Sequence, residues 1–127
     1  MATTRRPGRA LGDDRGQAAI EFAIALPIVV IAMLAIAQVG VAVRNEVAVE
    51  LAAREGARAA AVSADPAAAG AAARRAVDLP MDVAVATDAT TVTVTVTYVD
   101  PTDIAIIGAA IGPVTHTASA TMAIEPP

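Results

Sequence analysis

A long apolar segment near the start of the chain limits what this sequence can fold into. Residues 18–43 read AAIEFAIALPIVVIAMLAIAQVGVAV, with Glu21 as the only charged residue and Gln38 as the only other strongly polar one. At a rise of about 1.5 Å per residue, roughly twenty helical residues cross the hydrocarbon layer of a membrane. Because a spanning segment must satisfy its own backbone hydrogen bonds, its β-branched residues do not prevent a helix. We predict a transmembrane helix over residues 17–43.

Arginines ahead of this segment predict its orientation. Four of them precede it, namely Arg5, Arg6, Arg9 and Arg15. Arginine close to a span favours the cytoplasmic side of a membrane. We therefore expect residues 1–16 to form a cytoplasmic leader and residues 44–127 to form a small extracytoplasmic domain.

An ordinary secretory signal is the alternative interpretation of the same segment. Ala35-Ile36-Ala37 has the A-x-A form of a signal cleavage site, and cleavage there would leave Gln38 as the first residue. The chain would then be a secreted or tethered extracytoplasmic binding domain. However, the apolar run is longer than the roughly 7–15 residues of a typical signal core, and it continues past Ala37.

Glu21 needs a separate explanation, because a carboxylate costs about 2.5 kcal/mol or more at the centre of a bilayer and less near its edge. One interpretation places Glu21 at the membrane interface, where it reaches water or Arg15. The other supposes cleavage after Gly16, which would create an α-amino group at Gln17, one helical turn from Glu21. A buried amine and a buried carboxylate neutralise each other within or between subunits, so Glu21 would set the register of packed helices.

The spacing from Gly16 to Glu21 resembles the class III signal of type IV pilins, in which glycine precedes the cut and glutamate is the fifth mature residue. The pair Glu21-Phe22 is similar to the Glu-Tyr or Glu-Phe pair of the Flp (Tad) branch of these pilins. A second block, LAAREGARAAAV at residues 51–62, follows the apolar segment. Together, RGQAAIEFAIALPIVV and this block resemble the TadE family of pilus-assembly proteins.

The family block Ala-Arg-Glu-Gly-Ala-Arg is matched by Arg54, Glu55, Gly56, Ala57 and Arg58. The chain departs from the family pattern in having no cysteine and in carrying two acids, at positions 13 and 14, in its leader.

The resemblance implies a non-catalytic minor pseudopilin or assembly factor of a Tad-type pilus or related secretion apparatus. It implies an N-in, single-pass location in the bacterial cytoplasmic (inner) membrane, with incorporation into a pilus as a further step. The implied partners are membrane lipid, other pilins or pseudopilins, Tad-type assembly proteins, and a prepilin peptidase acting between Gly16 and Gln17. Glu21 and Phe22 are implied in subunit register, and Arg54, Glu55, Gly56 and Arg58 in structural or partner contacts.

The segment after Arg44 retains helical character, so we expect the first helix to continue unbroken to about Val62. Pro27 removes one helical hydrogen bond and predicts a mild kink. Expected pairs on the helix surface are Glu50 with Arg54 and Glu55 with Arg58. We expect its apolar stripe to comprise Val43, Val47, Leu51 and Ala52.

The remainder predicts a small α+β domain. Asp65-Pro66 has the form of a helix start, and we expect a short helix from there through Ala76, before Pro80. Alternating residues then predict three antiparallel strands, around 83–85, 92–98 and 117–124, packed through their apolar faces on the alanine-rich helix.

Composition disfavours most other classes of function. The chain is 56% hydrophobic but only 2% aromatic, and it contains no cysteine and a single histidine. Its basic residues are scattered arginines, which argues against a nucleic-acid surface, and no catalytic constellation, metal site or cofactor site emerges. We interpret His116 as a structural or an exposed histidine without nearby partners, and Asp100 and Asp103 as turn-capping residues. Gly108-Ala109-Ala110-Ile111-Gly112 has the G-x-x-x-G form, but its apolar run is too short to span a membrane, so we expect a loop or buried turn.

Overall fold

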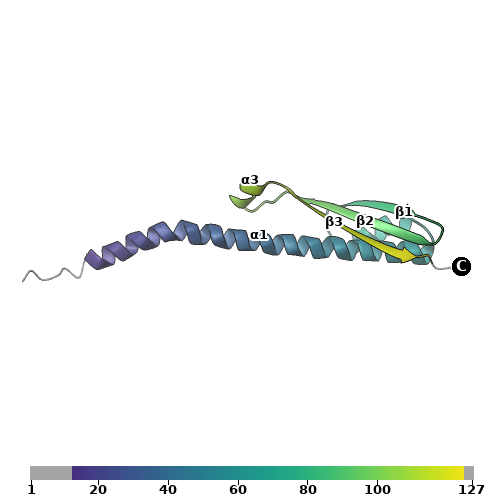
Figure 1. Cartoon of the computed structure of the whole chain (residues 1–127), viewed down its shortest axis with the longest axis horizontal. Coiled ribbons are helices and arrows are strands. Elements are labelled where there is room, and N and C mark those ends of the chain that lie inside the picture. The colour runs from purple at the N-terminus through teal and green to yellow at the C-terminus, as the bar shows by residue number, and fades with distance from the viewer. Residues whose placement is uncertain (1–12, 125–127) are drawn as a thin grey trace, which may run out of the picture.

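The computed structural model describes residues 13–124, with side chains from residue 16 onward. Most of the expected leader therefore lies outside the described residues. The elements in chain order are α1 (Asp13–Ser63), α2 (Ala67–Ala76), β1 (Asp82–Thr87), β2 (Thr91–Asp100), α3 (Ile107–Ile111) and β3 (Val114–Ala123). Figure 1 shows α1 as a rod whose C-terminal half carries the other elements, while its N-terminal half extends alone. The predicted α+β class is confirmed.

The first helix is longer than the domain that it supports. It contains 51 residues and passes through Pro27 without ending, and Figure 1 shows this part of α1 curving gently. The prediction that α1 continues unbroken to about Val62 is confirmed, because the helix ends at Ser63. There the Ser63 hydroxyl donates a hydrogen bond to the backbone carbonyl of Ala59 at 2.7 Å.

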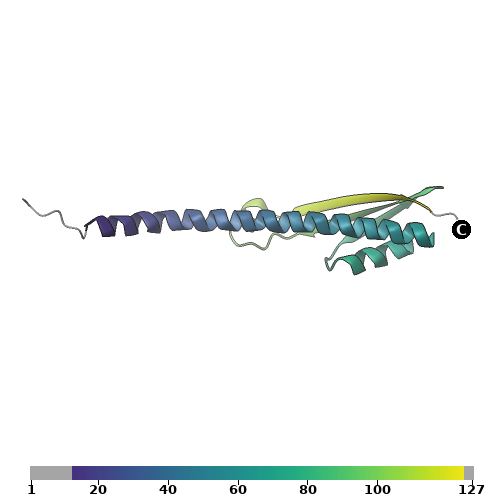
Figure 2. The same cartoon turned by 90° about the horizontal axis from the view of Figure 1, so that it is seen from below.

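The sheet has the strand order β1-β2-β3, and both pairs of strands are antiparallel. The central strand presents alternate residues to the helices, and these are buried: Val92, Val94, Val96 and Tyr98. On its other face, threonine hydroxyls bond across to β3, as in the 2.7 Å contact between Thr93 and Thr121. Figure 2 shows α1 and α2 on the same side of the sheet. The period-two pattern thus predicted the strands and their buried face.

The helix face that packs against the sheet is made of small residues. The buried residues on it are Val49, Ala52, Ala53, Gly56, Ala57, Ala60 and Ala61. The predicted stripe was wrong for three of its four members, because Val43, Val47 and Leu51 are 58%, 59% and 46% exposed. The valines of β2 occupy the space between helix and sheet, so small helical residues allow the closest approach. The larger apolar side chains of α1 therefore do not indicate which face packs against the sheet.

One of the two predicted ion pairs on α1 forms. Arg54 donates to the Glu50 carboxylate one turn earlier. Among the residues that the structure describes, no ion pair joins Glu55 to Arg58. Glu55 is half-buried and Arg58 is exposed.

The start and end of α2 follow the predicted signals. The Asp65 carboxylate accepts a hydrogen bond from the backbone N–H of Ala67 at 2.9 Å, which satisfies one of the free donors at the helix start. The helix ends at Ala76, and Val77 is already extended, with φ −144°. Pro80 lies beyond this end, as expected.

Asp88 in the β1–β2 turn generates a prediction about pH. Its carboxylate accepts backbone N–H groups of Thr90 at 2.8 Å and Thr91 at 2.7 Å, and the Thr91 hydroxyl at 2.7 Å. These bonds, that from the Thr90 backbone first, lower the pKa of Asp88 from 3.8 to about 2. Since the folded-state pKa is lowered, the stabilisation is present above about pH 4 and is lost as pH falls toward 2. We expect Asp88→Asn to reduce the change in thermal midpoint across this range.

The measurement is thermal unfolding of the detergent-solubilised chain, followed by circular dichroism between pH 2 and 5. Asp82→Asn is the matched control, because Asp82 is an exposed carboxylate at the start of β1. It should retain the pH dependence of the parent chain. An Asp88→Asn variant with that same dependence would contradict the prediction.

Candidate membrane anchor and assembly surface

The N-terminal half of α1 presents a wide apolar surface. Within residues 16–124, α1 is the one helix that is long and apolar enough to cross a membrane. The C-terminal half of α1 forms a folded domain with α2, α3 and the sheet, which is called the head below. The large side chains of the N-terminal half lie away from the head, as illustrated by Phe22, Ile28 and Ile36, which are 67%, 68% and 72% exposed. A contiguous surface of this kind marks an interaction with lipid or with another protein. The anchor predicted from the sequence is therefore exposed and available for such contacts.

The residues of the expected processing site lie within α1. Gly16 and Gln17 are helical and exposed, and the Gln17 side-chain amide donates to the Glu21 carboxylate at 3.1 Å. Positions 17 and 21 therefore share one helix face. The hypothesis of an amine paired with Glu21 requires this placement.

Gly56, from the family block, sits where three elements meet. A Cβ atom at this position would lie 3.1 Å from Val94 Cγ1 of β2 and 3.2 Å from the carbonyl oxygen of Ala69 in α2. Both distances are tighter than ordinary van der Waals contact. Gly56 thus allows α1 to approach the sheet and α2 at once, and its observed role is packing.

The charged residues of the same block point away from this junction. Glu55 and Arg58 line a shallow groove between α1 and α2, together with Leu51, Val62 and Arg75. Motif reasoning did not reveal this groove, because Arg75 comes from α2 and only the tertiary structure places it beside α1. The block therefore divides into a buried small-residue face and an exposed charged face.

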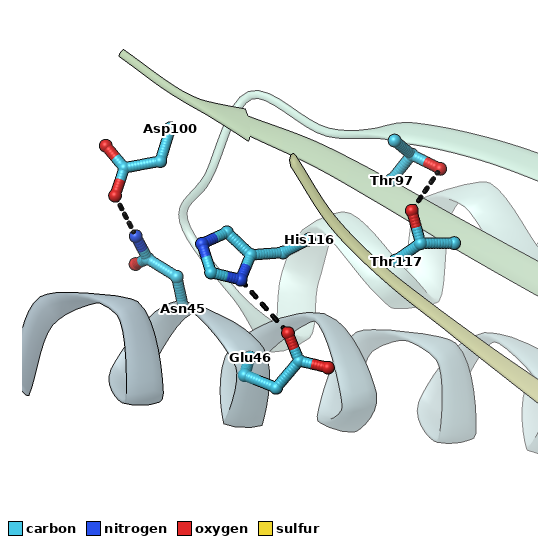
Figure 3. Close-up of polar contacts among 6 residues, drawn as sticks. All are labelled: Asn45, Glu46, Thr97, Asp100, His116 and Thr117. Carbon is cyan, nitrogen blue, oxygen red and sulfur yellow. Dashed lines mark hydrogen bonds and ion pairs between the residues drawn. The ribbon is translucent and has the colours of Figure 1, made fainter. Parts of the chain in front are cut away.

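A polar junction joins the sheet to α1 just beyond the apolar segment (Figure 3). The Asn45 amide donates to the Asp100 carboxylate at 2.8 Å, and both residues are buried. His116 Nδ1 lies 3.0 Å from the Glu46 carboxylate, and its ring stacks on Tyr98 with the centroids 6.3 Å apart. This junction fixes the membrane-proximal end of the sheet on the helix.

The junction corrects one expectation and supports two others. His116 was predicted to lack nearby partners, which is wrong, because Glu46 approaches it from 70 residues away in the sequence. Its buried position agrees with the structural role proposed for it. Asp100 caps its turn by accepting the backbone N–H of Thr102 at 2.9 Å. Within the described part of the chain, no three His, Cys, Asp or Glu side chains gather in a group that could hold a metal.

Two glycines provide a matched test of the packing role of Gly56. Gly56→Leu should lower the free energy of unfolding of the head by about 1–3 kcal/mol, because the side chain overfills the junction. Gly70→Ala should instead raise it by up to about 1 kcal/mol, since its Cβ meets only the end of the Arg74 side chain. Urea unfolding of both variants, monitored by circular dichroism, would give the two values. Equal effects of the two substitutions would contradict this assignment.

Comparison with protein families connects these features. The model described as TadE-like protein matches residues 16–58, which run from the expected processing site through the anchor to Arg58. Searches of the curated proteins and of the solved structures returned no match. The matched range contains the exposed apolar half of α1 and the block around Gly56, and it ends before α2 and the sheet. Residues 16–58 of this chain are thus similar to TadE-like proteins, and this range contains the motifs that predicted the resemblance.

Proposed function

We propose that this chain is a membrane-anchored, pilin-like subunit or assembly factor of a Tad/Flp-type pilus or a related secretion apparatus, without catalytic activity of its own. One observation carries the proposal: the residues that match the TadE-like model include the N-terminal half of α1, whose apolar side chains are not covered by the head. Its partners are membrane lipid, other pilins or pseudopilins, Tad-type assembly proteins and a prepilin peptidase.

In this proposal the chain crosses the bacterial cytoplasmic membrane once, with its N-terminus in the cytoplasm and its head outside. The arginines before the span support this orientation. The polar junction at Asn45 and Glu46 places the folded head just beyond the apolar segment, which fits a single crossing with the head on one side of the membrane.

Helix packing within the membrane brings subunits together. The small residues Ala23, Ala25, Ala32, Ala35 and Gly40 are exposed along the anchor. Small residues of this kind let neighbouring helices approach closely in lipid. After cleavage following Gly16, the new amine at Gln17 pairs with Glu21 of the same or an adjacent subunit and selects one register, with Phe22 beside it.

The groove between α1 and α2 is the proposed contact for an assembly partner outside the membrane. Glu55, Arg58 and Arg75 supply charges of both signs there, and Leu51 and Val62 supply apolar area. Surfaces that combine apolar area with charged side chains occur at protein–protein interfaces. Arg54 stays with Glu50 beside this groove.

Mass spectrometry of the N-terminus, on protein recovered from its native membrane, tests the proposal. A start at Gln17 would support processing after Gly16. A start at Gln38 would mean ordinary secretion and would overturn the proposal in favour of a released binding domain. A start at Met1 or Ala2 would leave an unprocessed anchor and remove the amine–Glu21 mechanism.

Glu21→Ala tests the register mechanism directly. We expect normal membrane insertion, because the substitution makes the span more apolar, and a fall in incorporation into the assembly of about tenfold or more, which corresponds to a coupling of about 1.4 kcal/mol. The readouts are membrane fractionation and quantitative immunoblotting of sheared surface pili. Glu50→Ala is the matched control, since Glu50 is an exposed carboxylate of the same helix outside the span. Normal pilus incorporation of Glu21→Ala would contradict the register role.

A further inference from the structure

The connection between β2 and β3 is apolar and turned outward. This segment, residues 101–113, contains α3 and is called the foot loop below. Its one charged residue is Asp103, and from Ile104 to Pro113 it carries none. Ile106 and Ile111 are 58% and 55% exposed, although the head as a whole has few large apolar side chains. An exposed apolar loop on such a small domain marks a contact with something outside it.

The foot loop lies beside the outer end of the apolar segment. β2 ends at Asp100, which is bonded to Asn45, and the loop continues past that level toward the N-terminus of α1. Figure 1 shows α3 at the end of the head nearest the bare half of α1. Gln38 is buried and Leu34, one turn earlier, is half-buried. Since the sheet ends near Asn45, the foot loop is the segment that covers them.

Helix geometry gives the depth of this contact. A hydrocarbon layer of about 30 Å needs roughly twenty residues, and residues 18–37, apolar except for Glu21, supply that length. The outer boundary of the layer therefore falls at Gln38, beside α3. Arg44 lies about 9 Å further along the helix axis, beyond most of the headgroup layer. The charged groups of the junction are thus outside the bilayer while the foot loop is at its edge.

Internal hydrogen bonds hold the foot loop in one conformation. The Thr102 hydroxyl donates to the carbonyl of Gly112 at 2.8 Å, which ties the start of the loop to its end. A tight turn, closed by a 2.8 Å bond from the Ile107 N–H to the Ala105 carbonyl, places Ile106 at φ 71°. This conformation is strained for a β-branched residue. Ile106 is thus exposed in a turn that a β-branched residue disfavours.

We propose that the foot loop inserts Ile106 and Ile111 into the outer headgroup region of the lipid bilayer. The occupant of this apolar surface is lipid because the surface is continuous with the spanning part of α1 and lies at the same depth as its outer boundary. Amphipathic elements at such a boundary bury their apolar side chains among headgroups and upper acyl chains. The contact gives the head a second attachment and fixes its tilt relative to the membrane. This inference rests on the proposed membrane anchoring of α1.

Because the chain contains no cysteine, single cysteines give an unambiguous test. Ile111→Cys and Ala109→Cys report on the foot loop, and both positions are exposed. Ile31→Cys reports on the span, and Ala89→Cys on the exposed β1–β2 turn. Each full-length variant is labelled with a nitroxide and reconstituted in phosphatidylethanolamine–phosphatidylglycerol vesicles. Electron paramagnetic resonance then measures its collision with oxygen, which concentrates in lipid, and with a water-soluble nickel chelate.

We expect the oxygen-to-nickel ratio at residues 109 and 111 to be severalfold higher than at residue 89 and to lie below the value at residue 31, which is deeper in the bilayer. A ratio at 109 and 111 equal to that at 89, with residue 31 still in lipid, would overturn the foot contact but leave the anchor intact. Low accessibility to both reagents at 109 and 111 would assign the surface to a protein contact and also overturn the proposal. A low ratio at residue 31 would overturn the membrane anchor itself, and the foot contact with it.

Discussion

The close approach of α1 to the sheet is the constraint on which the rest of the structure depends. With 2% aromatic residues, the chain cannot fill a wide gap between layers with large rings. Instead, Ala52 and Ala57 bring the helix backbone close to the valines of β2, and Gly56 marks the tightest point, where α2 also arrives. Each alanine buries little area, so the core depends on many close contacts rather than on a few large side chains. Substitutions that add volume on this face separate both layers at once.

Because the face of α1 with small side chains packs into the core, the faces with larger side chains remain available for other contacts. Val43, Val47 and Leu51 point away from the sheet, and most of the larger apolar residues of the anchor are exposed, as Phe22, Ile28 and Ile36 illustrate. The charged half of the family block is likewise left on the groove between α1 and α2. A subunit that must bind lipid and other subunits needs such residual surfaces. In this chain α1 contributes to both of these surfaces, so in the proposed function membrane contacts and assembly contacts would share one helix as their scaffold.

The parts that could be predicted from the sequence are those with local signals. The span follows from a run of apolar residues, the strands from the alternation around Val94, and the start of α2 from Asp65 and Pro66. The polar junction could not be predicted, because Asn45 meets Asp100 from 55 residues away and Glu46 meets His116 from 70. The core face of α1 was missed for another reason: hydrophobic ranking favours valine and leucine, whereas close packing favours alanine. The groove could not be predicted either. Arg75 joins it only through the tertiary placement of α2, and the charged residues that line it follow no periodic pattern in the sequence.

The anchor and the head overlap along α1. Charge patterning divides the chain at Arg44, but Gln38 is already buried by the head, so one part of α1 serves both membrane and domain. In the proposed assembly, lipid and neighbouring helices offer the apolar surface of α1 nearly equivalent surroundings, and apolar contact alone does not fix how helices align. A charge in the span does, because only one alignment brings it to its counter-charge. Glu21 near the cytoplasmic end and the foot loop near the outer end would then fix, respectively, the register of the helix and the depth of the head.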